Sequence, residues 1–209
     1  MKLILCVVFC LSLGFISCTS DEKVTKENAS EVLVAEARSF LTGDIVLNTH
    51  ATMNSVNKTL LKTGCPTKFK FEWSDTNTNI CTISLLNFTV GNMGMIINFE
   101  CAVQTMQLNT WEKDEYKEDG WFKFYGKDGN VFGEDTDSGE KSSAKGSSVK
   151  GYYNADTHEI NFIVDYNMMN VRSECFLQTV DKSLLANYDA LKAQYEIDLA
   201  EAKKEQGKK

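Results

Sequence analysis

The sequence predicts a mainly β protein of the α+β class, with an antiparallel sheet or barrel between an N-terminal helix and a long C-terminal helix. Three observations predict this fold. Apolar and polar residues alternate through much of residues 44–179, as in half-buried strands. Clusters of Asn, Asp and Gly separate the alternating runs and are typical of turns. Apolar residues stand three or four apart over 29–42 and 182–205, which is helical spacing.

Bulk composition favours one globular domain. The 209 residues are 43% hydrophobic and 24% charged, which are ordinary globular values. The formal net charge of −7 disfavours nucleic-acid binding, which needs a basic face. Beyond the N-terminal segment, no apolar run approaches the roughly 20 residues of a spanning helix.

Residues 1–17 predict a signal peptide. The apolar run from Leu3 to Ile16 is too short to span a bilayer and suits a secretory signal. Ser17 and Cys18 close this run, and the pattern resembles the lipobox of bacterial lipoproteins, in which the mature cysteine carries acyl chains. We therefore expect a lipidated Cys18, a polar tether over 18–27 and a single β-rich domain over 28–209. The alternative is an ordinary signal peptide that happens to end beside a cysteine.

Four further cysteines remain in the predicted domain: Cys65, Cys81, Cys101 and Cys175. An even number in an exported protein permits two disulfides in any of three connectivities. The alternative is four free, buried thiols. The sequence favours neither, and no Cys-x-x-Cys pair or nearby histidine predicts a zinc site.

The first helix and strand follow the tether. Asn28 and Glu31 have the spacing of a capping box, and Gly43 follows the last apolar position of the 29–42 helix, where a left-handed residue is common. Alternation over 44–56 predicts a strand. Leu60 and Leu61 suggest a short helix over 57–64, which ends before Cys65-Pro66 because proline disfavours helix in the preceding residue.

The clearest hairpin comes next. Phe69, Phe71 and Trp73 alternate with charged residues, as in a strand. The apolar phase then slips at Leu85-Leu86, which predicts a β-bulge. A turn at 91–94 leads to a strand with five apolar residues in one phase: Met95, Ile97, Phe99, Cys101 and Val103.

A strand over 121–125 and a structureless loop over 126–148 are expected in the middle of the chain. The loop contains Asp135-Thr136-Asp137-Ser138-Gly139, the opening of some calcium loops. It lacks the third ligand and the glutamate at position twelve, so we expect a solvated acidic loop. Of the three tryptophans, Trp111 lies among charged residues and is the one expected to be exposed, which makes it a weak candidate for ligand binding.

A second hairpin over 149–168 and a final strand containing Val171, Cys175 and Leu177 complete the predicted sheet. The C-terminal helix over 182–205 has an apolar seam that packs across the sheet or, alternatively, pairs with another chain. Its members are Leu184, Tyr188, Leu191, Tyr195, Leu199 and Ala202.

No catalytic motif is present. His50 lies in a predicted strand and His158 beside a predicted turn, and both are expected to be structural. No nucleophile elbow, zinc-protease, dinucleotide or phosphate-loop pattern occurs. We therefore expect a protein that is not an enzyme and has no cofactor or metal.

Three segments carry a family resemblance: the tag Ser20-Asp21-Glu22 after Cys18, residues 83–91 (ISLLNFTVG) and residues 166–171 (YNMMNV). With the strand-rich layout, they resemble small Bacteroidetes lipoproteins of unknown-function families, some of them calycin-like or lipocalin-like barrels. The resemblance implies a lipid-anchored outer-membrane protein on the cell surface, or alternatively one facing the periplasm. The function expected is non-enzymatic binding of a small apolar ligand, a glycan or an envelope protein. The alternative is a structural or assembly partner acting through the C-terminal helix.

Overall fold

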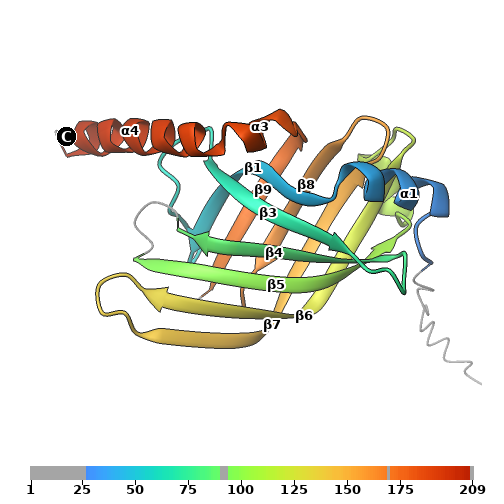
Figure 1. Cartoon of the computed structure of the whole chain (residues 1–209), viewed down its shortest axis with the longest axis horizontal. Coiled ribbons are helices and arrows are strands. Elements are labelled where there is room, and N and C mark those ends of the chain that lie inside the picture. Colours follow the sequence, from blue (N-terminus) through green and yellow to red (C-terminus); the bar gives the residue numbers. More distant parts are fainter. Residues whose placement is uncertain (1–26, 90–93, 169, 208–209) are drawn as a thin grey trace, which may run out of the picture.

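A computed structural model describes residues 27–89, 94–168 and 170–207. The predicted signal peptide, Cys18, nearly all of the tether and most of the 91–94 turn lie outside these ranges. Figure 1 shows a barrel with helices at one end and along one side. The elements are α1 (Glu31–Phe40), β1 (Gly43–Met53), β2 (Val56–Asn57), β3 (Cys65–Trp73), β4 (Ile80–Phe88), β5 (Met95–Met106), α2 (Thr110–Glu115), β6 (Trp121–Asp135), β7 (Lys141–Asn154), β8 (Glu159–Asp165), β9 (Val171–Thr179), α3 (Ser183–Ala186) and α4 (Tyr188–Gln206).

Eight antiparallel strands close the barrel, in the order β1-β3-β4-β5-β6-β7-β8-β9. The closing contact is made by β1, whose first part pairs with β3 and whose last part, from His50 to Met53, pairs with β9. The pairing of β1 with β9 over four residues joins the two ends of the sheet and protects strand edges that an open sheet would expose. The mainly β prediction with flanking helices is confirmed, and the sheet takes the barrel form.

Side chains fill the barrel. An eight-stranded barrel is just wide enough for its own side chains or for one small ligand. Here the inward positions carry buried rings, and Phe162 meets Phe69, Phe71 and Phe124 with ring centroids 5.0, 6.5 and 5.9 Å away. The void beneath α1, lined by residues of β3 to β6, measures only about 10 Å³.

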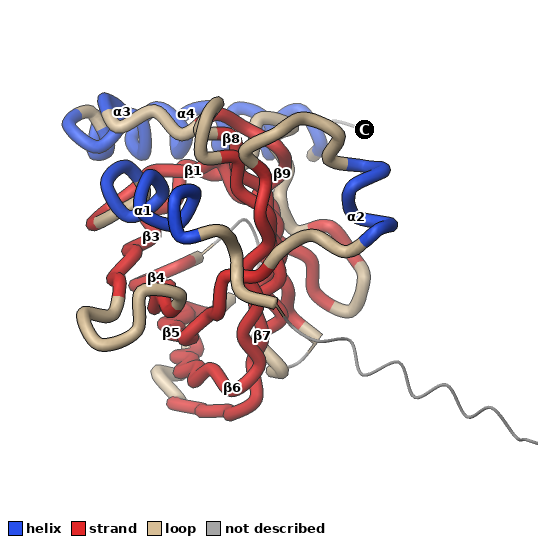
Figure 2. The backbone as a smooth tube through the Cα atoms, turned by 90° about the vertical axis from the view of Figure 1, so that its right-hand side faces the viewer, coloured by secondary structure: helices blue, strands red, loops and turns tan. Residues whose placement is uncertain are grey.

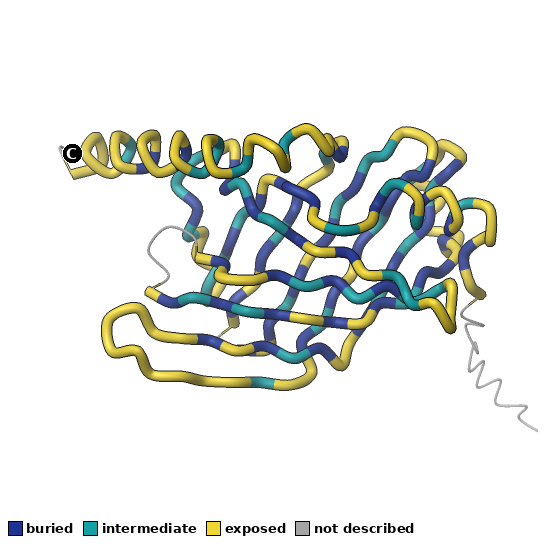
Figure 3. The backbone as a smooth tube through the Cα atoms, viewed as in Figure 1, coloured by how far each residue is buried: buried dark blue, intermediate teal, exposed yellow. Residues whose placement is uncertain are grey.

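The helices lie outside this core. Figure 2 shows α1 across the end of the barrel, where Val34 and Ala37 are buried and Trp73 Nε1 donates a 2.6 Å hydrogen bond to the Leu41 carbonyl. In Figure 1, α4 runs along the side of the barrel and projects past its far end. Tyr195 and Leu199 are its buried residues, whereas most of its surface is exposed (Figure 3). The predicted apolar seam therefore contains both buried residues of the helix, and its other members are only partly buried.

Several predicted strand features are confirmed. The register between β4 and β5 shifts between Leu85 and Phe88, where the phase slip predicts a bulge. The five in-phase apolar residues of β5, Met95, Ile97, Phe99, Cys101 and Val103, are all buried. The hairpin of β7 and β8 turns at residues 155–158, as expected. Trp111 is 83% exposed.

The predicted helix over 57–64 is wrong. Asn54 and Ser55 have φ of 52° and 63°, so they form a tight turn that pairs β2 with the end of β1. The Ala51 N–H then donates to the Thr59 hydroxyl at 2.8 Å, which holds this segment extended. The pair Leu60-Leu61 packs against the core from a loop.

The capping box predicted at Asn28 is also wrong. Ser30 is the N-cap of α1 and makes no side-chain capping bond, while the Asn28 side chain accepts from Gln104 Nε2 at 2.8 Å. A capping box does form at Asn109 and Glu112, at the start of α2. Asn109 and Glu112 have the same three-residue spacing, but the capping box in this charged segment was not predicted.

The predicted loop over 126–148 is instead the long hairpin of β6 and β7. Several of its inward positions, among them Gly126, Gly129 and Ser147, carry glycine or serine because the barrel has no room for larger groups there. A Cβ on Gly126 would lie 2.3 Å from the Ala102 carbonyl oxygen. The segment therefore lacks the apolar alternation by which strands are predicted. Leu177 lies in β9, as predicted for the final strand, and is 56% exposed beyond a register shift between β8 and β9 at Ile160 and Phe162.

Candidate functional site

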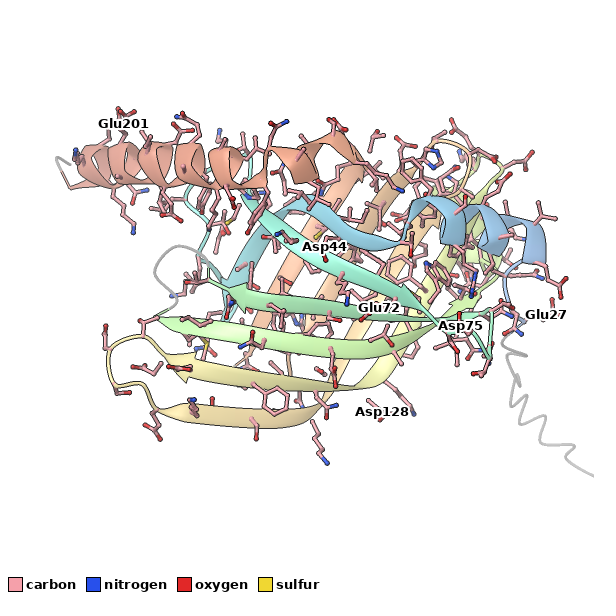
Figure 4. All side chains as sticks on the ribbon, in the orientation of Figure 1. Glu27, Asp44, Glu72, Asp75, Asp128 and Glu201 are labelled. Carbon is pink, nitrogen blue, oxygen red and sulfur yellow. The ribbon has the colours of Figure 1, made fainter. Side chains whose placement is uncertain are left out.

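The outer wall of the barrel carries the candidate site, because the interior is occupied by side chains. A groove of about 690 Å³ crosses β1, β3, β4, β5 and β6, and the first residue of α4 contributes to its edge. We call it the outer groove. It is lined by Asp44, Lys68, Lys70, Glu72, Ser84, Leu86, Asn87, Asn98, Phe99, Glu100, Phe132 and Tyr188. In Figure 4, Asp44 and Glu72 mark its wall on the face turned to the viewer.

A row of five polar side chains crosses the outer groove; four of them line it, and the fifth, Asn130, continues the row beyond the lining. The strand registers place one residue of each strand side by side, in the order Asp44, Lys70, Ser84, Glu100 and Asn130. Neighbours in such a row stand about 4.5–5.5 Å apart. Because outward positions alternate with inward ones, the same strands that bury the core present this row to solvent.

The charged side chains of the row are accessible, and Lys70 and Glu100 have polar partners. Lys70 Nζ lies 2.7 Å from Glu72 Oε1, and both side chains are about half exposed. The hydrogen bond and the charge of Glu72 raise the pKa of Lys70. Asn130 Nδ2 donates to Glu100 Oε1 at 3.4 Å. Such surface pairs contribute little to stability, so their hydrogen-bonding groups can exchange partners with a ligand at small cost.

Exposed apolar and aromatic groups flank the row. Leu86 is 71% exposed and Phe132 is 55% exposed. Both apolar side chains therefore leave much of their surface in contact with water. At the other side, Lys68 Nζ lies 4.5 Å from the centre of the Tyr188 ring, which brings α4 to the groove edge. Exposed rings next to ordered polar groups are typical of binding surfaces.

A second groove lies on the wall of β1, β9 and β8, and we call it the rear groove. It measures about 750 Å³ and includes His50, Ile163, Arg172 and Phe176. The His50 and Phe176 rings are 4.7 Å apart, and burial lowers the pKa of His50 despite the nearby Glu174. Arg172 is already engaged, since its Nε lies 2.8 Å from Asp165 Oδ2.

The structure places the predicted site residues apart from one another. Cys65, Cys81, Cys101 and Cys175 are free and buried in this structure, which agrees with the free-thiol alternative. Cys81 faces Val103 and Cys101 faces Ile83 across the β4–β5 ladder. Trp111 lies on α2, outside both grooves.

The remaining candidates have structural partners. His158 stacks on Phe40 with ring centroids 3.6 Å apart, and Asp135 Oδ1 accepts from Ser138 N at 2.8 Å, which makes the acidic segment a turn. Within residues 27–89, 94–168 and 170–207, no group of three or more His, Cys, Asp or Glu side chains could hold a metal ion. No helix in these ranges is long and apolar enough to cross a membrane.

Sequence reasoning missed the outer groove. Its residues come from five strands and a helix, and only the strand registers bring them together. Leu86 was the one available signal, because it stands out of phase beside the predicted bulge.

Comparison with known proteins places the chain in a family without assigning an activity. The family described as Domain of unknown function (DUF4903) matches residues 18–207. No curated protein and no solved structure matches the chain. Because the match spans nearly the whole sequence, the chain belongs to the DUF4903 family.

Proposed function

We propose that this protein is a non-enzymatic, lipid-anchored module of the cell envelope that binds a glycan in the outer groove. The observation that carries the proposal is the contrast between the two faces of the wall. The void on the inner face beneath α1 measures only about 10 Å³, whereas the outer face has a groove of about 690 Å³. Of the three expected ligand classes, a small apolar ligand would need the interior space that the side chains occupy.

The chemistry of the outer groove suits a saccharide chain. Sugar hydroxyls are donors and acceptors spaced a few ångströms apart, and the row from Asp44 to Asn130 offers carboxylate, ammonium, hydroxyl and amide groups at about 5 Å intervals. The apolar C–H face of a sugar ring packs on an aromatic ring, and Phe132 is exposed beside the row.

The position of the groove fits attachment through Cys18. The family match begins at this residue, and Glu27 lies at the α1 end of the barrel while Glu201 lies at the opposite end (Figure 4). A tether from Cys18 to Glu27 would reach at most about 30 Å. Asn28 pairs with Met106 at the end of β5, and Asn98 lies about 26 Å back along that strand. Anchoring would thus hold the groove away from the bilayer, at the cell surface or, alternatively, in the periplasm.

The glycan proposal is tested with two matched variants. Purified protein is applied to immobilised oligosaccharides that include plant, host and bacterial surface structures, and hits are measured by calorimetry. Phe132→Ala should weaken binding at least about tenfold, the equivalent of one lost stacking contact. Phe176→Ala is the control, because Phe176 is 51% exposed in the rear groove and Phe132 is 55% exposed. Absence of saccharide binding, or equal losses in both variants, would reject the proposal.

The anchor is tested separately by intact mass and by proteolysis of whole cells. Protein expressed with its own signal should carry acyl chains, and a Cys18→Ala variant should not. Accessibility to protease on intact cells distinguishes the cell surface from the periplasm. If the wild-type protein has an unmodified mass, the lipid anchor is rejected, and the proposal of a glycan site in the outer groove is not affected.

A second candidate function, assembly through α4, is favoured by the exposure of one apolar residue. Ile197 is 54% exposed on the helix, on the side away from the buried Tyr195 and Leu199. Deletion of residues 182–209 would uncover the core under those two residues, so a surface substitution is the cleaner test. If α4 joins two chains, Ile197→Glu should abolish a dimer that wild-type protein shows by light scattering. A monomeric wild type would exclude self-assembly through this face.

A further inference from the structure

A thiol and an amine from distant parts of the chain meet where α4 lies on the barrel. Cys65 Sγ, at the start of β3, lies 3.4 Å from Lys192 Nζ in α4. Cys65 is 1% exposed, whereas the Lys192 side chain is 28% exposed. The amine is therefore partly open to solvent at this contact, whereas the sulfur is buried beneath it.

A third group lies at this place. The Tyr195 hydroxyl is buried and interacts with the same sulfur, and within the described ranges no oxygen or nitrogen atom hydrogen-bonds to it. Buried hydroxyl groups are normally paired. An oxygen atom added to the Cys65 sulfur during oxidation would give this hydroxyl a better acceptor than the sulfur itself.

We propose that Cys65 and Lys192 form an oxidative cross-linking site, at which a peroxide joins the thiol and the amine through a covalent S–N bond. The sulfur attacks one peroxide oxygen, the O–O bond breaks, and a sulfenic acid and water form. The Lys192 ammonium gives one proton to water, and the lone pair of the resulting amine then forms the S–N bond. The S–O bond breaks, and the hydroxyl group leaves as water with a proton from the amine. Sulfur loses two electrons, and one peroxide becomes two waters.

The other cysteines of the domain provide internal controls. Burial raises the pKa of Cys81, Cys101 and Cys175 to about 12, 11 and 12, and buried thiols of this kind are inert. Burial also raises the pKa of Cys65, but the charge of Lys192 opposes this effect. Cys65 should therefore react slowly at neutral pH and still ahead of the other three.

The test exposes full-length protein to excess hydrogen peroxide and maps the products by peptide mass spectrometry. The expected product is a peptide pair joined through Cys65 and Lys192, about 2 Da lighter than the sum of the two and separated again by a thiol reductant. Lys192→Arg keeps the positive charge over Cys65 but removes the amine, so it should give no linked pair.

Thermal unfolding gives an independent measure. A bond between positions 127 residues apart constrains the unfolded chain and should raise the unfolding midpoint of the oxidised wild type, but not of the oxidised Lys192→Arg variant. The proposal is overturned if wild-type Cys65 stops at a trapped sulfenic acid, or stays reduced while Cys81, Cys101 or Cys175 is oxidised.

Discussion

The Glu112 carboxylate lies 2.7 Å from Lys123 Nζ, and the two side chains are only 11% and 16% exposed. The same carboxylate accepts from the Tyr152 hydroxyl at 3.0 Å and from the Asn109 N–H at 2.9 Å. Tyr116, just after α2, stacks on Tyr152 with ring centroids 4.3 Å apart. These contacts hold the charged and aromatic segment after β5 against the outer wall of β6 and β7. Trp111, in the same segment, is exposed to solvent.

Removal of Glu112 should destabilise the protein strongly. Glu112→Ala leaves Lys123 without its counter-charge in a mostly buried place, and the expected loss is about 2–4 kcal/mol in the free energy of unfolding. Glu72→Ala is the matched control, because the Lys70–Glu72 pair has the same 2.7 Å distance but is about half exposed, and its loss should cost less than about 1 kcal/mol. Urea denaturation measures both. Equal losses would show that burial does not govern these pairs.

The contribution of Glu112 should disappear in acid. Burial alone would raise its pKa, but the Asn109 N–H, Lys123 and Tyr152 together outweigh burial and lower the pKa from the ordinary 4.5. A group whose pKa is lower in the folded state stabilises the protein above its unfolded pKa, and this stability is lost as pH falls through the folded pKa. The difference in unfolding free energy between wild type and Glu112→Gln should therefore be constant above about pH 5 and shrink below pH 4.5. A difference that stays constant down to pH 2 would contradict this assignment.

A methyl group added to the inner wall at Gly151 should be poorly tolerated. A Cβ there would lie 2.3 Å from Phe162 Cβ and 2.5 Å from Phe124 Cζ, so Gly151→Ala must push apart two packed rings. Overpacking of this kind costs about 1–3 kcal/mol. Gly207→Ala at the end of α4 is the control, since its nearest neighbour would be 3.7 Å away. A Gly151→Ala variant as stable as wild type would mean that the barrel wall can widen at β7.

The sequence predicts the parts of this fold that depend on alternation, and it fails where small residues replace apolar ones. The five inward residues of β5 are evident from their period. The inward positions Gly126 and Gly129 of β6 cannot be recognised in this way. Close packing in the barrel leaves no space for a side chain there, so these positions carry no apolar residue. Contacts between residues far apart in the sequence also cannot be predicted from the sequence. The row from Asp44 to Asn130, and the contact of Cys65 with Lys192, exist only once the strand registers and the path of α4 are known.

Trp111 should contribute nothing to stability, despite its size. At 83% exposure it buries little surface, so Trp111→Ala should change the unfolding free energy by no more than about 0.5 kcal/mol. Trp73→Ala should cost about 3–5 kcal/mol, because Trp73 is packed under α1 and donates to the Leu41 carbonyl at 2.6 Å. The same Trp111→Ala variant should bind saccharides like wild type. A loss of saccharide binding in this variant would move the ligand from the outer groove to α2.

A double-mutant cycle at Tyr166 and Ser173 should detect a polar contact inside the apolar barrel. Their hydroxyl oxygens lie 2.8 Å apart, and the two residues are 0% and 1% exposed. Tyr166→Phe leaves the Ser173 hydroxyl buried without this partner, and Ser173→Ala does the same to Tyr166, so each should cost about 1–3 kcal/mol. The double variant removes both hydroxyls and should be about 1 kcal/mol more stable than the sum of the single losses implies. Strictly additive losses would show that water or another group already satisfies each hydroxyl, and that the interior at this point is less dry than the packed rings around it indicate.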